Sequence, residues 1–298
     1  MDYVVLSKSS SSLFSAIKSI DFYKVKLLLE SGANANVRSV FGITPLYLAV
    51  ELGYIDIASL LLEYNADIAC SMDSVSVFHL STHNPNMLSL IVNKKLVIMC
   101  NIFFPYNEKL QKMFLKDFLT SNKSFKFEEA VKFIIENNGN VNAKDQDMVS
   151  LLSMACAVGN YKTVRMLIEA NIEKDFKDHY ATALHYAFNS NVSEILAYLL
   201  TQGCNIDICD AEGDYPESWA VFEDRWENLQ KVLNLKNSNN TYLVDPNKLL
   251  HRKQGDGKSI LEMVRSDYKD SCCACYIEEY IKKLNLPITS TKARYLAK

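Results

Sequence analysis

Two histidines, His79 and His83, stand four residues apart, a spacing that can place two metal ligands on one face of a helix. The residues between them are Leu80, Ser81 and Thr82, so the glutamate of the His-Glu-x-x-His zinc motif is absent. No third ligand follows at a comparable spacing. The pair therefore does not predict a zinc site, and we expect no bound metal.

The densest group of thiols is Cys272, Cys273 and Cys275. Structural zinc sites use two separated pairs of ligands, and this cluster has no partner pair. Cysteine also packs as a small hydrophobic residue, so a buried helix face is the preferred interpretation. The eight cysteines show no regular pairing, and the first residues lack the basic segment of a secretory signal. We therefore expect reduced thiols and an intracellular location, cytoplasmic or nuclear.

No stretch of the sequence matches a known catalytic motif. The glycine-containing segment GDGKS at 255–259 is too short to cradle phosphates as a nucleotide-binding loop does. We therefore predict that the chain is not an enzyme and uses no cofactor. A cryptic enzyme built from the two least regular segments is the competing hypothesis. The polar residues that such a site would have to use are Cys100, Asp117, Asp245 and His251.

The bulk composition argues against two classes of partner. The 298 residues are 49% hydrophobic and 22% charged, which is typical of a folded globular chain. The formal net charge of -3 is too small to favour nucleic acid or a membrane surface. No apolar run approaches the ~20 residues that a membrane-spanning helix needs. Neither nucleic acid nor a membrane is therefore expected as a partner.

One pattern recurs along the chain: a short apolar helix that begins at Thr or Ser, a turn, a second helix rich in leucine, and an Asn-containing loop. The clearest copy is FGITPLYLAVELGYIDIASLLLEYNADI at 41–68, and the segments 149–176 and 181–208 align with it. Two successive intervals, from 150 to 182 and from 182 to 215, are 32 and 33 residues long. The equivalent helix-start positions are Thr44, Ser150, Thr182, Tyr215 and Ser259.

This period, together with the segment TPLYLA at 44–49, resembles the ankyrin repeat, whose period is about 33 residues and whose signature is Thr-Pro-Leu-His-x-Ala. The segment TALHYA at 182–187 carries the signature histidine, His185, whose implied role is to satisfy loop backbone groups. The resemblance implies an all-α solenoid of stacked helix–turn–helix repeats with short finger loops. Its terminal and middle repeats are expected to be atypical.

Elementary helix chemistry agrees with this resemblance. A Thr or Ser at the start of a helix can cap its exposed N–H groups. Pro45 occupies a position where its missing N–H costs nothing. Gly53 and Gly159 fall between paired helices, where a tight turn favours a residue without Cβ.

The resemblance covers nearly the whole chain as a single array of about eight helical pairs. Because interfaces between neighbouring repeats stabilise a solenoid, the degenerate middle repeats predict a bend or weaker coupling. The expected segments are 13–38 (N-terminal cap repeat), 39–70 (regular repeat), 71–143 (degenerate repeats with an insertion at 96–126), 144–235 (regular repeats), 236–254 (insertion) and 255–298 (C-terminal capping repeat).

An ankyrin-like array implies protein recognition on a concave surface of finger tips and first helices. An apolar finger at 40–43 and an acidic, aromatic segment at 207–227 are its most distinctive parts. The acidic segment suits a basic peptide or protein segment, although a merely solvated face is the slightly favoured interpretation. The protein-binding candidates are Val40, Phe41, Ile43, Glu51, Leu52, Gln146, Asp147, Asp178, His179, Asn189, Glu212, Asp214, Phe222, Glu223 and Trp226.

The resemblance also implies a modification and a biological setting. Asn36 and Asn142 are candidates for asparaginyl hydroxylation, although such residues ordinarily bond the neighbouring loop backbone. The predicted function is a non-catalytic interaction scaffold or adaptor. The alternative, suggested by the biased composition and eroded repeats, is a viral or intracellular-bacterial adaptor. It would engage signalling or ubiquitin machinery in the host cell cytoplasm.

Overall fold

The computed structural model describes residues 8–72, 75–104, 109, 111, 113, 127–145 and 147–284. Short helices dominate this part of the chain, and its named strands are the antiparallel pair β1 (Ser71–Met72) and β2 (Val75–Ser76). The helices are α1 (Lys8–Lys18), α2 (Phe22–Glu30), α3 (Pro45–Glu51), α4 (Ile55–Glu63), α5 (Val77–Ser81), α6 (Pro85–Ile98), α7 (Cys100–Phe103), α9 (Phe127–Glu136), α10 (Leu151–Val158), α11 (Tyr161–Glu169), α12 (Ala183–Asn189), α13 (Ser193–Thr201), α14 (Pro216–Phe222), α15 (Trp226–Leu233), α16 (Pro246–His251), α17 (Ile260–Ser266) and α18 (Cys272–Leu284).

The first helices begin as the sequence predicts. Thr44 Oγ1 accepts a hydrogen bond from the backbone N–H of Tyr47 at 3.2 Å, and Pro45 follows as the first residue of α3. Ser150 caps α10 in the same way. Gly159 ends α10 with a φ of 75°, a left-handed conformation that favours glycine. The predicted caps and turn are confirmed.

The helices form two parallel rows. The first helices α10, α12 and α14 contact one another along the inner row, and α11, α13 and α15 do so along the outer row. Apolar side chains fill the space between the rows, and Tyr186 and Phe188 are among the largest that are fully buried. Four of the fingers close with a short antiparallel bridge; the bridged pairs are Lys144–Ser150, Lys177–Thr182, Lys236–Tyr242 and Lys253–Ser259.

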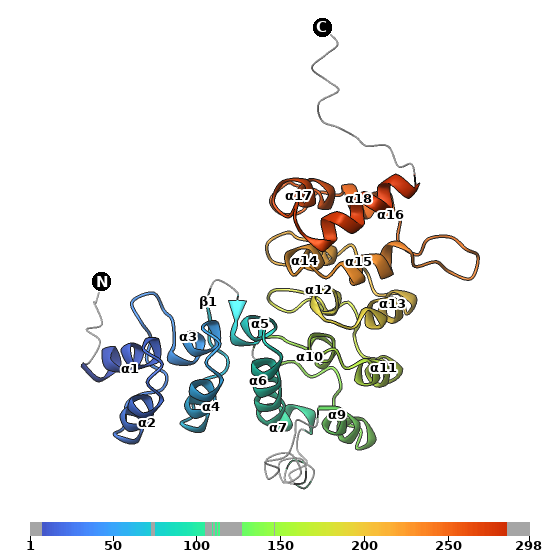
Figure 1. Cartoon of the computed structure of the whole chain (residues 1–298). Coiled ribbons are helices and arrows are strands. Elements are labelled where there is room, and N and C mark those ends of the chain that lie inside the picture. Colours follow the sequence, from blue (N-terminus) through green and yellow to red (C-terminus); the bar gives the residue numbers. More distant parts are fainter. Residues whose placement is uncertain are drawn as a thin grey trace.

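The array changes direction in its middle, where the sequence predicts a bend. In Figure 1 the repeats of α1–α6 follow one another from left to right, whereas those from α9 to α18 are stacked from bottom to top. At the junction α6, a second helix, contacts both α9 and the first helix α10. Most of the expected insertion at 96–126 lies outside the described residues.

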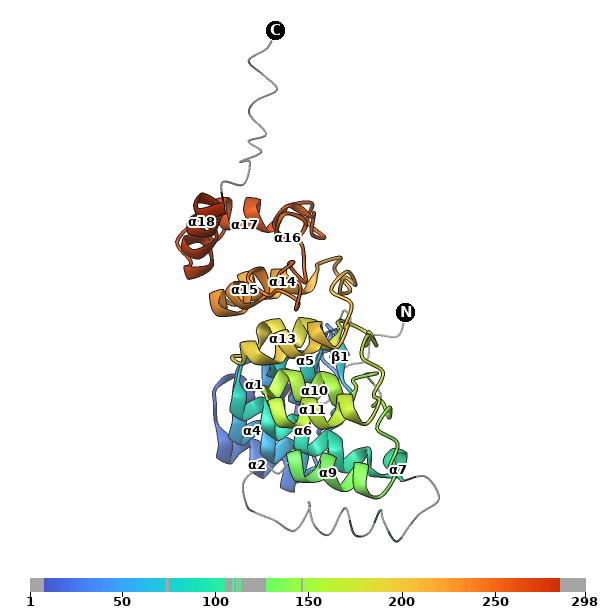
Figure 2. The same cartoon turned by 90° about the vertical axis from the view of Figure 1, so that its right-hand side faces the viewer.

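The segment 236–254 contains more than a polar loop. It holds the finger bridged between Lys236 and Tyr242, followed by α16, which packs against α17. Figure 2 shows α16 beside the stack of paired helices. The inner row continues directly from α14 to α17. Helix α16 is therefore an addition on the side of the array.

Candidate functional site

Helix α6 carries a buried lysine that ties the two halves of the array together. Lys95 is 2% exposed, and its Nζ lies 2.5 Å from Asp145 Oδ2 and 2.6 Å from Asp147 Oδ2. Both aspartates belong to the finger that precedes α10. Burial acts to lower the pKa of Lys95, but the two carboxylates outweigh it and raise that pKa. The charged lysine is therefore held by both of its partners.

Helix α5 lies against the next finger and against α12. His79 is buried beside Tyr180, with 4.9 Å between the ring centroids. Its Nδ1 accepts from the backbone N–H of Ser76, which places the ring proton on Nε2. Nε2 has no hydrogen-bond acceptor in the part of the chain that the structure describes; Asp178 Oδ1 lies 3.7 Å away. Asp178 is itself buried and accepts from the Tyr186 hydroxyl at 2.8 Å.

The residues that follow α5 continue this contact toward α14. The Asn189 amide Nδ2 donates to Thr82 Oγ1 at 3.4 Å, and His83 Nδ1 lies 2.9 Å from Glu223 Oε1. Hydrogen bonding to Glu223 raises the pKa of His83, and the same bond lowers the pKa of Glu223. Each group therefore favours the charged form of the other. Helix α5 and its flanking residues thus cover part of the inner surface of the C-terminal repeats.

Several residues that the sequence predicts to be exposed are buried in the structure. The sequence predicts an exposed binding surface that includes Asp147, Asp178, Asn189 and Asp214, but all four are buried. The first three face α5, α6 or the residue that follows α5. The repeat period of the sequence does not predict that these helices lie against the C-terminal fingers. Among the other candidates of the C-terminal half, His179, Glu212 and Phe222 are exposed, Glu223 and Trp226 are half-buried, and Gln146 lies outside the described residues.

A second internal contact covers part of the acidic segment at 207–227. Arg252, just after α16, pairs with the fully buried Glu217 and stacks 3.9 Å above the ring of Tyr215. Its Nη1 and Lys248 Nζ each lie 2.7 Å from Asp207. Burial raises the pKa of Glu217 although Arg252 opposes the shift. The chain itself therefore supplies basic partners for two acidic residues of this segment, Asp207 and Glu217.

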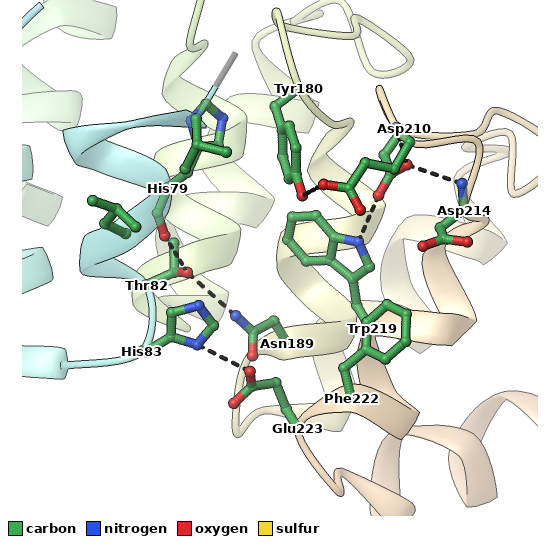
Figure 3. Close-up of a pocket in the computed structure, with 13 residues that line it drawn as sticks. His79, Thr82, His83, Tyr180, Asn189, Asp210, Asp214, Trp219, Phe222 and Glu223 are labelled. Atoms are coloured by element: carbon green, nitrogen blue, oxygen red, sulfur yellow. Dashed lines mark hydrogen bonds and ion pairs between the residues drawn. The ribbon is translucent and has the colours of Figure 1, made fainter. Parts of the chain in front are cut away.

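A small open pocket lies between these two internal contacts. It has a volume of about 240 Å³ and lies between α5, the finger around Asp210 and helix α14 (Figure 3). Trp219, Tyr180 and Phe222 supply aromatic walls, and the Trp219 and Tyr180 rings are 5.8 Å apart. Asp210 positions Trp219 by accepting from its indole Nε1–H at 2.9 Å. Residues of both halves of the array therefore form the wall of this pocket.

His185 performs the structural role that its signature position implies. Its Nδ1 accepts from the backbone N–H of Thr182 at 3.2 Å, and its Nε2 is 3.1 Å from the carbonyl oxygen of Asp214. Both ring nitrogens are therefore used, one within its own repeat and one toward the next finger. Desolvation lowers the pKa of His185 to about 4.

The N-terminal finger shows the opposite situation. Val40 is 79% exposed and Phe41 is 77% exposed at its tip, while Ile43 is half-buried against the core. Glu51 and Leu52, at the end of α3, are also exposed. Exposed apolar side chains often mark a contact with another molecule. This finger therefore keeps the features expected of a binding surface.

The two candidate hydroxylation residues connect successive loops. Asn36 Nδ2 donates to the carbonyl oxygen of Asn65 at 3.0 Å, and Asn36 Oδ1 accepts from the backbone N–H of Asp67 at 2.7 Å. Asn142 Oδ1 accepts from the backbone N–H of Glu173 at 2.8 Å. These bonds are the ordinary role of such residues, and hydroxylation stays a prediction.

The cysteine cluster lies at the start of α18. The backbone N–H groups of Cys272 and Cys273 donate to the Asp224 carboxylate. Cys273 is buried, but Cys272 and Cys275 are exposed, so the expected buried face holds for only one of the three. None of the eight cysteines, all within the described residues, is in a disulfide. Among the residues that the structure describes, no group of His, Cys, Asp and Glu has a metal-binding arrangement, and no helix has the length and apolarity needed to cross a membrane.

Sequence reasoning missed Lys95 and Arg252, the two basic residues that organise the site. A local signal existed for Lys95. It lies four residues after Ile91 and seven after Leu88, both buried, so it falls on the apolar stripe of its helix. A lysine in that position needs an acidic partner. Arg252 had no comparable signal, because it lies in a polar segment.

Comparison with known proteins agrees with this architecture. A family model that describes three copies of the ankyrin repeat matches residues 6–100 and 121–243. The chain belongs to the ankyrin-repeat family, and its all-α solenoid fold is confirmed. Repeats of this family are generally non-catalytic modules for protein–protein interaction.

Three relatives show how the match is distributed. An ankyrin repeat protein of fowlpox virus (strain NVSL) is 32% identical over 167 aligned positions, and the alignment covers 53% of this chain and 20% of that protein. An ankyrin repeat protein of Acanthamoeba polyphaga mimivirus is 23% identical over 270 aligned positions, which cover 88% of this chain and 31% of the relative. The NAD-dependent deacetylase sir2B of Dictyostelium discoideum is 26% identical over 305 aligned positions, gaps included, which cover 92% of this chain and 37% of the relative. This chain thus spans well under half the length of each.

Proposed function

We propose that this chain is a non-catalytic scaffold that binds a partner protein through the finger and first helix of its N-terminal half. The observation that carries the proposal is the exposure of Val40 and Phe41 on a finger whose base is held by Thr44 and Pro45. A rigid finger loses little conformational entropy when it binds, so more of its contact energy becomes affinity. In the C-terminal half, internal contacts cover several equivalent positions.

A non-catalytic role agrees with the family and with the residues that a cryptic active site would need. Asp245 caps α16 by accepting from the backbone N–H of Asn247 at 2.9 Å. Cys100 is buried in the core and is not open to a substrate. His251 Nδ1 lies 2.9 Å from the Asn247 carbonyl oxygen. Asp117 lies outside the described residues.

The second proposal is a viral adaptor that acts on host proteins inside the cell. The similarity to ankyrin repeat proteins of fowlpox virus and of a mimivirus supports it. The adaptor would act in the cytoplasm or nucleus, a setting in keeping with cysteines that form no disulfide. Host signalling or ubiquitin machinery is the proposed class of target.

Substitution of Phe41 by aspartate should abolish capture of the partner protein, because it places a charge at the centre of an apolar contact. The measurement is affinity capture from cell lysate with the full chain, followed by identification of the retained proteins. Leu27→Asp is the matched control, since Leu27 is an apolar residue on α2 that is 65% exposed. Circular dichroism should show the same helix content for both variants. Equal capture by Phe41→Asp and by the parent chain would refute the proposed surface.

A further inference from the structure

We propose that the pocket between α5 and α14 binds one arginine side chain of a partner peptide. This inference rests on the proposed role as a protein-interaction scaffold and adds the chemistry of the group that is recognised. The volume of about 240 Å³ is below the range of about 300–1,000 Å³ that is usual for small-molecule sites. A pocket of this size suits one side chain better than a cofactor.

The carboxylates in the pocket wall make it a site for a cation. Asp210 uses both of its oxygens internally, toward Trp219 and toward backbone N–H groups. Glu212 accepts from the Tyr180 hydroxyl through Oε1 at 3.0 Å, and Asp214 accepts from the Gly255 N–H through Oδ1 at 2.8 Å. The second oxygen of Glu212 and of Asp214 has no hydrogen bond within the described residues. These oxygens can accept N–H donors from a ligand.

The raised pKa of Asp214 agrees with a site for a cation. Burial raises its pKa, and the neighbouring carboxylates Asp210, Glu212 and Asp256 add to the shift. Of the two histidines in the pocket wall, His83 already pairs with Glu223. Negative charge is therefore in excess here, and a bound cation would relieve the repulsion.

The aromatic walls favour a guanidinium over an ammonium group. Guanidinium is planar and weakly hydrated, so it stacks on aromatic faces while its edge donates to carboxylates. Trp219 and Tyr180 provide such faces inside the pocket, and Phe222, which is 40% exposed, provides one at its rim. An ammonium is a strongly hydrated point charge and gains less from these walls.

His79 also lines the pocket, and Figure 3 shows its ring beside Tyr180. Its Nε2 is fully buried and lies 3.7 Å from Asp178 Oδ1, so a ligand in the pocket does not reach this atom. The proposed role as a protein-interaction scaffold makes a peptide side chain the expected source of the cation.

The test is an NMR titration of the full chain that follows the indole ¹H–¹⁵N resonance of Trp219, assigned with a Trp226→Phe variant. The probe is the capped pentapeptide Gly-Gly-Arg-Gly-Gly, compared with peptides that carry lysine or citrulline in place of arginine. The arginine peptide should shift the resonance in a saturable way. The lysine peptide should bind about threefold to tenfold more weakly, and citrulline, which is neutral, should cause no saturable shift.

Two matched variants identify the site. Glu212→Gln should weaken binding of the arginine peptide about threefold, because an exposed carboxylate is largely screened. Glu194→Gln removes an exposed carboxylate on α13, outside the pocket, and should leave binding unchanged. Equal shifts with arginine and citrulline, equal or tighter binding of lysine, or an unchanged affinity in Glu212→Gln would overturn the assignment. If the peptide does not bind while Phe41-dependent capture of a partner persists, this inference fails and the proposed scaffold function stands.

Discussion

Replacing Lys95 with methionine should lower the free energy of unfolding by about 3–5 kcal/mol, the range seen when one partner of a buried ion pair is removed. Methionine fills a similar volume but leaves Asp145 and Asp147 without their counter-charge in a buried position. Urea denaturation followed by circular dichroism measures the change. Because this contact holds α6 to the finger before α10, small-angle X-ray scattering should also show a more extended variant.

The control for this prediction is Lys132→Met. Lys132 pairs with Glu136 at 3.6 Å, but its side chain is 61% exposed, so its loss should cost less than about 0.5 kcal/mol. A triple variant that adds Asp145→Asn and Asp147→Asn to Lys95→Met should recover much of the lost stability, because no buried charge then stays unpaired. A cost below about 1 kcal/mol for Lys95→Met would show that the lysine is not buried between these carboxylates.

Acidification should destabilise the protein through His185. The ordinary pKa of histidine, 6.5, is lowered to about 4 in the folded chain. Between these values the unfolded state binds a proton that the folded state does not, so stability falls as the pH falls. At 1.4 kcal/mol per pKa unit, the loss approaches about 3 kcal/mol over the whole interval. Protonation would place a hydrogen on Nδ1, which already accepts from Thr182, so the folded state resists it.

The measurement is the free energy of unfolding at several pH values from 7 to 5, where few carboxylates titrate. His185→Gln should be less stable than the parent chain at neutral pH, but its stability should fall less steeply toward pH 5. His179→Gln changes an exposed histidine on the adjacent finger and should keep the steep dependence of the parent chain. An NMR titration that finds half-protonation of His185 near pH 6.5 would contradict the prediction.

By itself the sequence determined the elements of this protein and their local order. Thr44 and Ser150 begin helices by capping an N–H group within the first turn, and Pro45 fits the first helical position. Gly159 ends a helix because its own φ is positive. The spacing of about 33 residues then predicts which helices are neighbours, because each repeat of a solenoid contacts mainly the next. These features are legible since each depends on residues close together in the chain.

Only the tertiary structure decided what the inner surface looks like. Lys95 pairs with Asp145, which is 50 residues away in the sequence, and Asn189 donates a hydrogen bond to Thr82, which is 107 residues away. Neither separation follows from the repeat period. These contacts arise because α6 packs against α10 at the junction, which brings α5 onto the fingers of the C-terminal half. A periodic pattern specifies contacts between successive repeats, whereas the packing of one half of the array on the other depends on how side chains complement one another in space. That packing buried three predicted binding residues, Asp147, Asp178 and Asn189, and formed the acidic, aromatic pocket.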